Sequence, residues 1–464
     1  MWENAQYRPS GVREACGAAD IEPDACRTEY PVFPEVERNA ALSDAGADRT
    51  AAEACIRNAV IFRLICTDIT CQNGEYMYNI QLLNKIARVG TAAFDPERFA
   101  VGDSIENPDA IMVRSAAMHD MEFSGKLKAI ARAGAGVNNI PLERCAESGI
   151  VVFNTPGANA NGVKELAVAA LLLASRNIAG GMEWVKTLKG EENAAKLIEA
   201  GKSRFAGCEI KGKTLGVIGL GAIGGLVANA AVSLGMNVIG YDPYLTVEGA
   251  WSLSRSVTKA ASYDEIFASS DYISVHVPAT GETKGMFCLS SFAKMKDGVR
   301  IINLARAELV NSADLLEAVK AGKVAAYVTD FATPELIAAD DRIMVIPHLG
   351  ASTAESEDNC AVMAAEELVE FLTNGNIRNS VNYPNASMPH DGDARICIMH
   401  KNLPGTLSAI SSALADEKLN IENMLNRSRG NYAYTIIEII GQIPQTVADR
   451  LSGIENVIRV NIYN

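Results

Sequence analysis

The chain has few of the residues that mark several protein classes. Of its 464 residues only 5 are His and 3 are Trp, and the 42 Lys and Arg are outnumbered by 56 Asp and Glu. The net charge of −14 disfavours non-specific nucleic-acid binding, because no concentrated basic patch accompanies it. No apolar run reaches the roughly 20 residues that span a bilayer, and no signal-like segment opens the chain. We therefore expect a cytoplasmic protein that binds neither nucleic acid nor membrane.

Cysteine is present, but in no pattern that indicates disulfides or a metal site. Half of the 10 cysteines lie before residue 72, and the others are scattered through apolar or helical contexts. Cys66 and Cys71 have four residues between them and no histidine nearby, which is not a zinc-binding spacing. We expect reduced thiols and no metal.

The first part of the chain differs from the rest. Residues 1–77 mix charged residues, Ala and Cys without a sustained helical or strand period, and Pro23, Pro31 and Pro34 interrupt them. We predict an N-terminal extension that is either disordered or not natively translated, with Met77 as the initiator in a bacterium. The remaining length is enough for two or three domains.

From Tyr78 onward, short apolar runs predict a series of parallel strands. The predicted strands are 79–83, 110–113, 128–132 and 150–153, with helical or loop segments between them. Polar and glycine-rich residues follow the carboxyl end of each strand, as in 131–140 and 154–166. Open α/β sheets bind their ligands at that edge.

A second parallel unit begins with a dinucleotide-binding pattern. The predicted strand Thr214–Ile218 is followed by Gly219, Gly221 and Gly224 in G-x-G-x-x-G order and then by a helix. These glycines allow a tight turn, close approach to a pyrophosphate and close helix packing. Asp242, 23 residues after the first glycine, can accept both ribose hydroxyls and favours NAD over NADP. A glycine-rich turn without a ligand is the alternative.

Later patterns complete the predicted architecture. Together with 214–218 and the apolar run 237–240, strands at 272–277, 299–303, 325–329 and 342–346 predict a six-stranded doubly wound sheet. A helix at 351–374 returns to the first unit. The fold class is therefore α/β, with two Rossmann-like parallel-sheet domains of which the first is discontinuous. Its predicted parts are 78–176 and 347–385, and the NAD-binding domain is 177–346.

The C-terminal part predicts a small regulatory-type domain. The polar stretch 376–393 indicates a linker, whose last part, 386–393, separates the domains. Beyond it, predicted strands at 394–399, 432–440 and 457–462 and a helix at 405–417 favour a βαββαβ unit over 394–464. Its exposed strand edges need covering, so we expect a homodimer or homotetramer.

Four side chains at strand ends could carry chemistry. Arg306 follows one predicted strand, Asp330 and Glu335 follow the next, and His348 follows the last. An Arg fork can hold a carboxylate, and a His with a carboxylate partner suits a general base. The alternatives are a surface arginine, a solvated turn and a core histidine.

Several ordered motifs carry a family resemblance from about Tyr78 to the C-terminus. The segments 219–224 with Asp242, 303–310, 329–336 and 347–353 resemble the D-2-hydroxyacid dehydrogenase family. The segments 131–141, 154–166 and 375–384 resemble its members that act on 3-phosphoglycerate, and 399–407 is similar to the start of an ACT domain.

The resemblance implies a role for each matching residue. Arg306 would bind the substrate carboxylate, and Glu335 would hold His348 as it takes the hydroxyl proton. Arg114 and Arg132 would bind the phosphate. The implied cofactor contacts are Gly219, Gly221, Ala222, Ile223, Gly224, Asp242, Val277, Leu304, Ala305, Asp330, Gly350 and Ala351. His400, Asn402 and Asn420 would bind L-serine as an effector in the ACT unit.

The implied reaction is the NAD-dependent oxidation of 3-phosphoglycerate to 3-phosphohydroxypyruvate, the first step of serine synthesis. Two alternatives stay open. One is a dehydrogenase or reductase of another small 2-hydroxy or 2-oxo acid, such as 2-oxoglutarate. The other is a non-catalytic NAD-binding sensor that detects amino acids through its C-terminal domain.

Overall fold

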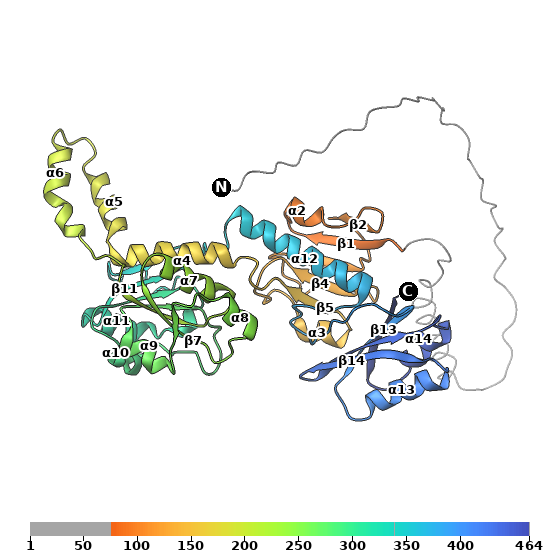
Figure 1. The fold of residues 1–464 in the computed structure, drawn as a ribbon. Helices are drawn as coiled ribbons and strands as arrows, with labels where there is room; N and C mark the ends of the chain where they lie inside the picture. Colours follow the sequence, from red (N-terminus) through yellow and green to blue (C-terminus); the bar gives the residue numbers. More distant parts are fainter. Residues whose placement is uncertain (1–75, 338, 464) are drawn as a thin grey trace, which may run out of the picture. The chain divides into compact units, whose positions relative to one another are not determined.

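The structure, a computed structural model, describes residues 76–337 and 339–463 (Figure 1). The predicted N-terminal extension, apart from its last two residues, lies outside the described residues. The described chain forms a five-stranded, a seven-stranded and a four-stranded sheet. The α/β fold class with two parallel-sheet domains is thereby confirmed, and a C-terminal α+β domain follows them.

The first sheet is parallel, with strand order β2-β1-β3-β4-β5. Its strands are β1 (Tyr78–Leu83), β2 (Phe99–Gly102), β3 (Ala110–Val113), β4 (Ala129–Arg132) and β5 (Val151–Asn154). Its helices are α2 (Arg88–Thr91), α3 (Leu142–Glu147) and the long α12 (Ala354–Asn374). The sequence missed only β2, a four-residue edge strand with one buried residue, Phe99. Helix α12 packs on this sheet, as predicted.

The second sheet is also parallel but has seven strands where six were expected. Its strands are β6 (Thr214–Ile218), β7 (Asn237–Tyr241), β8 (Val257–Lys259), β9 (Tyr272–Val275), β10 (Val299–Asn303), β11 (Val324–Thr329) and β12 (Ile343–Val345), in the order β12-β11-β10-β9-β6-β7-β8. Its helices are α4 (Ala160–Ser175), α5 (Ile178–Thr187), α6 (Ala194–Gly201), η1 (Lys202–Phe205), α7 (Ala222–Ser233), α8 (Val247–Ser252), α9 (Tyr263–Ser269), α10 (Leu289–Lys294), η2 (Ala307–Leu309) and α11 (Ser312–Lys320). The additional strand β8 has three residues, too few to show a period.

Helix α4 corrects the predicted domain boundary at residue 176. Val163, Ala167 and Leu171 pack in one core with Leu215 of β6 and Val227 of α7. The small side chains along α4 allow it to approach α7 closely, so the helix belongs to the second domain. The boundary therefore lies before α4, near residue 160, because the helix that leaves the first sheet buries its apolar side on the second.

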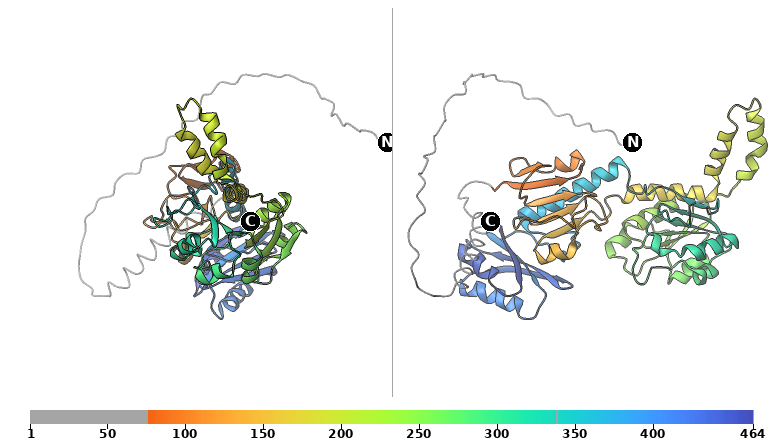
Figure 2. Two further views of the ribbon diagram at one scale, coloured as in Figure 1. Left: turned by 90° about the vertical axis from the view of Figure 1, so that its left-hand side faces the viewer. Right: turned by 180° about the vertical axis from the view of Figure 1, so that it is seen from behind.

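The third sheet is antiparallel, with strand order β14-β15-β13-β16. Its elements are β13 (Ala394–Lys401), α13 (Thr406–Asp416), β14 (Ile421–Arg429), β15 (Tyr432–Ile439), α14 (Gln445–Ser452) and β16 (Val457–Tyr463). Both helices lie on one face of the sheet (Figure 2). The βαββαβ order is the predicted one. Strand β14 was not placed because most of its residues are polar and exposed.

The first half of the polar stretch 376–393 folds onto the first domain, to which the predicted bounds 347–385 assign it. Tyr383 is fully buried, and its hydroxyl donates to the carbonyl of Ala146 at 2.7 Å. The Asn382 amide donates to Ile150 O at 2.8 Å and accepts from Val152 N at 2.9 Å. These bonds satisfy backbone groups beside the edge strand β5, where a further strand would otherwise pair. The polar residues of this segment therefore form hydrogen bonds with the backbone at the sheet edge rather than with solvent.

The C-terminal domain shares a hydrophobic core with the first domain. Met399, Tyr434 and Ile436, on the sheet face away from α13 and α14, belong to one buried cluster with Phe371 of α12. The Tyr434 hydroxyl also donates to the carbonyl of Gly375 at 2.6 Å, just beyond α12. The end of α12 is therefore held by the C-terminal sheet.

A buried acid lies on α12 inside this core. Glu367 is 7% exposed, and Asn379 donates to its Oε1 at 2.8 Å. Its Oε2 has no hydrogen-bond partner among the described residues. Burial raises the pKa of Glu367 to about 8, and the bond from Asn379 opposes that shift only in part. Glu367 is therefore protonated in the folded protein at neutral pH.

We expect the stability of Glu367→Gln relative to the parent protein to increase as the pH rises. In the unfolded chain the acid ionises above about pH 4.3. The stability from its buried neutral form is therefore complete below that pH and is lost as the pH approaches 8. Between pH 5 and pH 8.5 the urea unfolding free energy of the variant should gain on the parent by on the order of 3 kcal/mol. Glu355→Gln, at the exposed start of α12, is the control. An unchanged difference across this range would contradict the buried, neutral assignment.

Helices α5 and α6 form a hairpin that leaves apolar side chains exposed. Neither helix contains a buried residue, and Met182 is 60% exposed. Within the described residues no single helix is long and apolar enough to cross a membrane. Helices α4 and α5 together have the length and apolar composition of a membrane span, but the chain bends by 68° between them.

Candidate functional site

The glycine loop between β6 and α7 has the geometry expected of a dinucleotide cradle. Gly219 has φ 87°, and a Cβ there would lie 2.8 Å from the carbonyl oxygen of His276. A Cβ on Gly224 would overlap the carbonyl of Gly219. Nothing lies within 4 Å of the Cβ position of Gly221, which caps the N-terminus of α7. Two glycines are thus required by packing, whereas the third leaves open space at the helix start.

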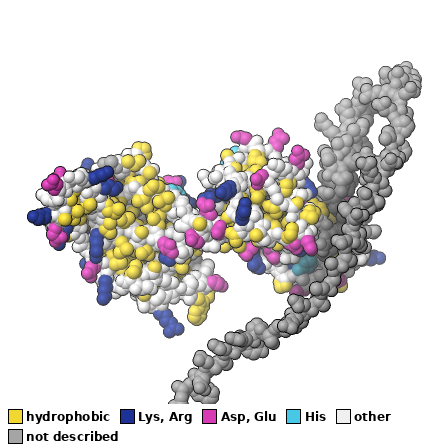
Figure 3. Space-filling model, turned by 90° about the horizontal axis from the view of Figure 1, so that it is seen from above, with side chains coloured by type: hydrophobic (Ala, Val, Ile, Leu, Met, Phe, Trp, Pro, Cys, Tyr) yellow, Lys and Arg dark blue, Asp and Glu magenta, His cyan; other side chains and the backbone are white. Residues whose placement is uncertain are grey.

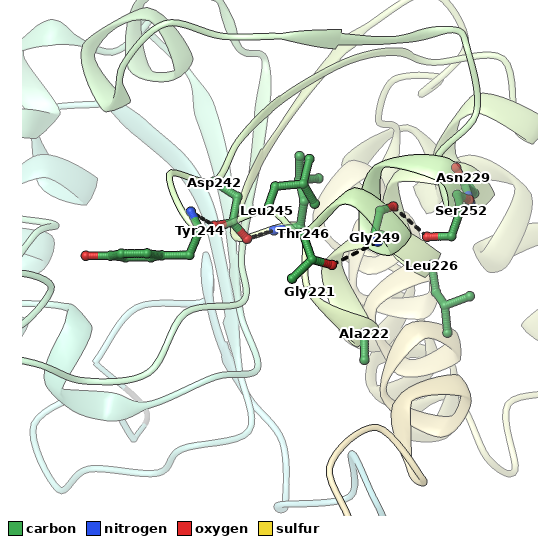
Figure 4. Close-up of a pocket in the computed structure, with 12 residues that line it drawn as sticks. Gly221, Ala222, Leu226, Asn229, Asp242, Tyr244, Leu245, Thr246, Gly249 and Ser252 are labelled. Carbon is green, nitrogen blue, oxygen red and sulfur yellow. Dashed lines mark hydrogen bonds between the residues drawn. The ribbon is translucent and has the colours of Figure 1, made fainter. Parts of the chain in front are cut away.

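Asp242 lies beside this loop at the end of β7. Its Oδ2 accepts from Leu220 N at 2.8 Å, and its Oδ1 accepts from Tyr244 N at 2.8 Å. Both bonds fix the carboxylate next to a pocket of about 250 Å³ (Figure 4). Each oxygen keeps a lone pair for a further donor. The pocket is lined by Leu220, Gly221, Ala222, Gly225, Leu226, Asn229, Asp242, Tyr244, Leu245, Thr246, Gly249 and Ser252.

The far wall of the pocket was not predicted. Tyr244 to Thr246 and helix α8 supply it, and Thr246 Oγ1 accepts from Gly249 N at 3.0 Å as an N-cap. The available signal was Thr246, a capping residue that starts a short helix four residues after Asp242. These residues lie beyond Asp242, where the predicted cofactor pattern ended.

Arg306 leaves the carboxyl end of β10 on a turn held by Asn303. The Asn303 Oδ1 accepts from Ala305 N at 3.1 Å and from Arg306 N at 3.3 Å. Its Nδ2 donates to Arg306 O at 2.8 Å, and the side chain is fully buried. The guanidinium is exposed and, among the described residues, makes one hydrogen bond, to Ala305 O at 2.6 Å. Asn303 was missed as a positioning residue, although a polar residue ending an apolar strand marked it.

His348 and Asp330 lie near Arg306, after β12 and β11. The His348 ring packs on Phe331, with centroids 4.7 Å apart. Asp330 is 3% exposed, and burial raises its pKa, while the nearby charges of His348 and Arg306 oppose the shift. The three predicted side chains are therefore close enough to interact electrostatically at one edge of the sheet.

The expected pairing of Glu335 with His348 is not formed by a hydrogen bond or an ion pair among the described residues. Glu335 is exposed on the turn after β11, and among the described residues no hydrogen bond joins it to His348. The carboxylate that interacts with the histidine in this structure is Asp330. The predicted role of Glu335 therefore requires a movement of its side chain, which its exposure permits.

The other predicted cofactor contacts lie at the carboxyl edge of the same sheet. Val277 follows β9, and Leu304 and Ala305 follow β10. Gly350 and Ala351 follow β12, while Ala222 and Ile223 begin α7. This is the edge at which open parallel sheets bind ligands.

Arg114 and Arg132 come together at the corresponding edge of the first sheet. Arg114 follows β3 and Arg132 is the last residue of the neighbouring strand β4, and Arg132 Nε donates to the carbonyl of Arg114 at 3.1 Å. Arg114 Nη2 donates to Glu357 Oε1 on α12 at 2.7 Å. Asn84, which was not predicted, accepts backbone N–H bonds from residues 114–116 and holds their turn.

The three predicted effector residues are not adjacent within the chain. His400 is buried, and its ring nitrogens lie 2.9 Å from Lys401 O and from Thr435 Oγ1. Asn402, just beyond β13, donates to Gly430 O at 3.2 Å. Asn420 precedes β14 and lies beside the start of β13, through the pairing of both strands with β15. The two ends of an eight-residue strand are about 20 Å apart, so one chain does not bring all three together.

Comparison with known proteins agrees with this arrangement. Residues 168–351 match the family model "D-isomer specific 2-hydroxyacid dehydrogenase, NAD binding domain". A D-3-phosphoglycerate dehydrogenase of Archaeoglobus fulgidus is 41% identical over 285 residues, which cover 60% of this chain and 52% of the relative. One of Haemophilus influenzae is 30% identical over 353 residues, which cover 74% of this chain and 82% of the relative.

A solved structure shares the fold. The NAD⁺-bound 3-phosphoglycerate dehydrogenase of Entamoeba histolytica has a TM-score of 0.52 and 27% identity, over 66% of this chain and 99% of that chain. The chain spans only about half the length of several curated relatives, such as the one from Archaeoglobus fulgidus (52%). The match to most of the Haemophilus influenzae relative, together with the family model, shows that this chain belongs to the D-isomer-specific 2-hydroxyacid dehydrogenase family.

Proposed function

We propose that the protein oxidises 3-phosphoglycerate to 3-phosphohydroxypyruvate with NAD, as the first step of L-serine synthesis. The observation that carries the substrate choice is the pair Arg114 and Arg132, which the first sheet brings together at its carboxyl edge. Two guanidinium groups suit a phosphate better than an uncharged substituent. Relatives named D-3-phosphoglycerate dehydrogenase support the choice.

NAD fits the second domain on two observations. A Cβ at Gly221 would enter open space at the start of α7, where N–H groups can meet a pyrophosphate. Asp242 is fixed beside this space with lone pairs available for ribose hydroxyls. When bound, NAD supplies the acceptor for the hydride that leaves C2 of the substrate.

The remaining chemistry belongs to residues of the chain. Arg306 has an exposed guanidinium, most of whose donors are unused by the described residues, and would bind the substrate carboxylate, which orients C2. His348 would take the proton of the C2 hydroxyl as the carbonyl forms. A carboxylate beside His348 would stabilise the resulting imidazolium, and both Asp330 and Glu335 are placed on the preceding loop.

We expect Gly221→Ala to impair NAD binding without unfolding the protein. Its φ of −68° is ordinary for alanine, and no protein atom lies within 4 Å of the added methyl group. The methyl would instead occupy the approach of the pyrophosphate, so Kd for NAD should rise by about tenfold or more, roughly 1.4 kcal/mol. Titration of NAD by fluorescence or calorimetry measures the effect, and the thermal midpoint is the control. An unchanged Kd would place the pyrophosphate elsewhere.

A substrate panel tests the reaction itself. Initial rates with NAD and 3-phosphoglycerate should exceed those with other D-2-hydroxy acids, and the reverse assay should compare 3-phosphohydroxypyruvate with 2-oxoglutarate. Turnover restricted to substrates without phosphate would favour the alternative dehydrogenase. NAD binding without turnover of any acid would favour the non-catalytic sensor.

The C-terminal domain is proposed to be an ACT domain that binds L-serine. A site that uses His400, Asn402 and Asn420 together needs the last residue from a second copy, because one chain keeps them apart. This supports a homo-oligomer, as does the exposed apolar surface of the second domain, on α4 to α6, within the apolar area seen in Figure 3. Sedimentation with and without serine tests both points. A cytoplasmic location remains the expectation from the sequence.

A further inference from the structure

A carboxylate that belongs to none of the predicted roles lies against a phosphate-binding candidate. Glu357, in the first turn of α12, forms an ion pair with Arg114 at 2.7 Å. It accepts the one hydrogen bond that the Arg114 guanidinium makes among the described residues. Both side chains are a little over 40% exposed, so an incoming solute can reach them.

The neighbouring arginine has no such partner. Arg132 makes no ion pair in the described part of the chain, and its Nε donates to the backbone carbonyl of Arg114. The site therefore holds two guanidinium groups and one carboxylate. A phosphate monoester carries a charge of about −1.5 to −2 at neutral pH, so Glu357 removes part of the positive charge that would balance it.

We propose that Glu357 determines how strongly this site binds a phosphorylated substrate, by occupying Arg114 until the phosphate displaces it. The inference rests on the proposed function for its substrate. A carboxylate and a phosphate use the same planar donors of an arginine, so they compete for one group. An exposed ion pair is weak, which makes the exchange feasible. After the exchange, the carboxylate remains next to the phosphate as a like charge.

Removal of the Glu357 charge has opposite effects on phosphate binding according to whether Glu357 competes with the phosphate or only positions Arg114. If Glu357 competes, removing its charge strengthens phosphate binding. If it mainly holds Arg114 in place, removing its charge weakens it. Repulsion between two unit charges about 4 Å apart in water changes a binding constant roughly fivefold. Two charges on the phosphate increase the effect.

Glu357→Gln tests the proposal, because glutamine keeps an acceptor for Arg114 and loses only the charge. We expect KM for 3-phosphoglycerate to fall about fivefold or more, with kcat within twofold of the parent. KM for D-glycerate, which lacks only the phosphate, should not change. The advantage of the variant should shrink at high salt, since exposed charges are screened. Asp358→Asn removes the same charge one residue further along α12 and should leave both KM values unchanged.

An unchanged or raised KM for 3-phosphoglycerate in Glu357→Gln would overturn the proposal, as would an equal fall for D-glycerate or for Asp358→Asn. Failure of the proposed function is separately visible, because the wild-type protein would then not turn over 3-phosphoglycerate. In that case, calorimetric titration with inorganic phosphate still tests Glu357. Tighter phosphate binding by Glu357→Gln than by the parent supports the inference, and equal or weaker binding contradicts it.

Discussion

Replacement of His348 by alanine is expected to lower kcat for 3-phosphoglycerate oxidation by two to four orders of magnitude. A positioned general base contributes about 10²- to 10⁴-fold to such a reaction. His348 lies after β12, against Phe331 and within reach of the charge of Asp330. Kd for NAD should be little changed, because the glycine loop and Asp242 lie at the ends of other strands. Steady-state rates and NAD titration measure the two quantities.

The control for this experiment is His390→Ala. His390 precedes the C-terminal domain and makes no hydrogen bond among the described residues. A kcat for His348→Ala within fivefold of the parent would show that another group takes the proton.

The same assay decides which carboxylate supports His348. Asp330 interacts electrostatically with it in this structure, whereas Glu335 is exposed and has no hydrogen bond to it among the described residues. A loss above tenfold in kcat for Glu335→Gln would mean that the contact forms when the substrate binds. A comparable loss confined to Asp330→Asn would assign the role to the residue already in place.

Replacement of Arg395 by methionine is expected to destabilise the protein by about 3–5 kcal/mol. Arg395 and Glu438 form an ion pair in which both side chains are fully buried. The guanidinium also donates to Asn374 O at 2.6 Å, Asn376 Oδ1 at 3.1 Å, Met388 O at 3.0 Å and Pro389 O at 2.6 Å. These four bonds join the C-terminal sheet to the end of α12 and to the segment that follows it. Removing the cation leaves a buried carboxylate without its partner and several carbonyls without donors.

Urea or thermal unfolding measures this loss, and Arg450→Met is the matched control. Arg450 pairs with Asp416 and Glu417, but its side chain is 43% exposed. Exposed pairs contribute about 0–1 kcal/mol, so this variant should unfold close to the parent. The double change Arg395→Met with Glu438→Leu should recover part of the loss, because an apolar pair leaves no buried charge. Equal midpoints for Arg395→Met and Arg450→Met would contradict a structural role for the buried pair.

Elements that arise from local interactions could be predicted from the sequence. The central strands β3, β6 and β10 were placed with the bounds that the structure shows, because uninterrupted apolar runs bounded by polar turns have few other uses. The glycine loop was equally accessible, since the conformation of Gly219 and the packing of Gly224 restrict those positions to glycine. Arg306 and His348 each follow a predicted strand. Because all strands of that sheet are parallel, both were placed at its carboxyl edge.

Features that join distant parts of the chain could be seen only in the folded protein. Glu357 meets Arg114 across 243 positions, and Asn382 bonds to Ile150 across 232. Neither pairing can be recognised from a sequence pattern. Arg114, Glu357 and Asn382 are each an ordinary polar residue on a helix or in a loop. The same applies to the core that the C-terminal sheet shares with α12 and to the distance between His400 and Asn420. Local patterns determined the strands and the cofactor loop, whereas long-range packing determined the charge around the phosphate site and the attachment of the C-terminal domain.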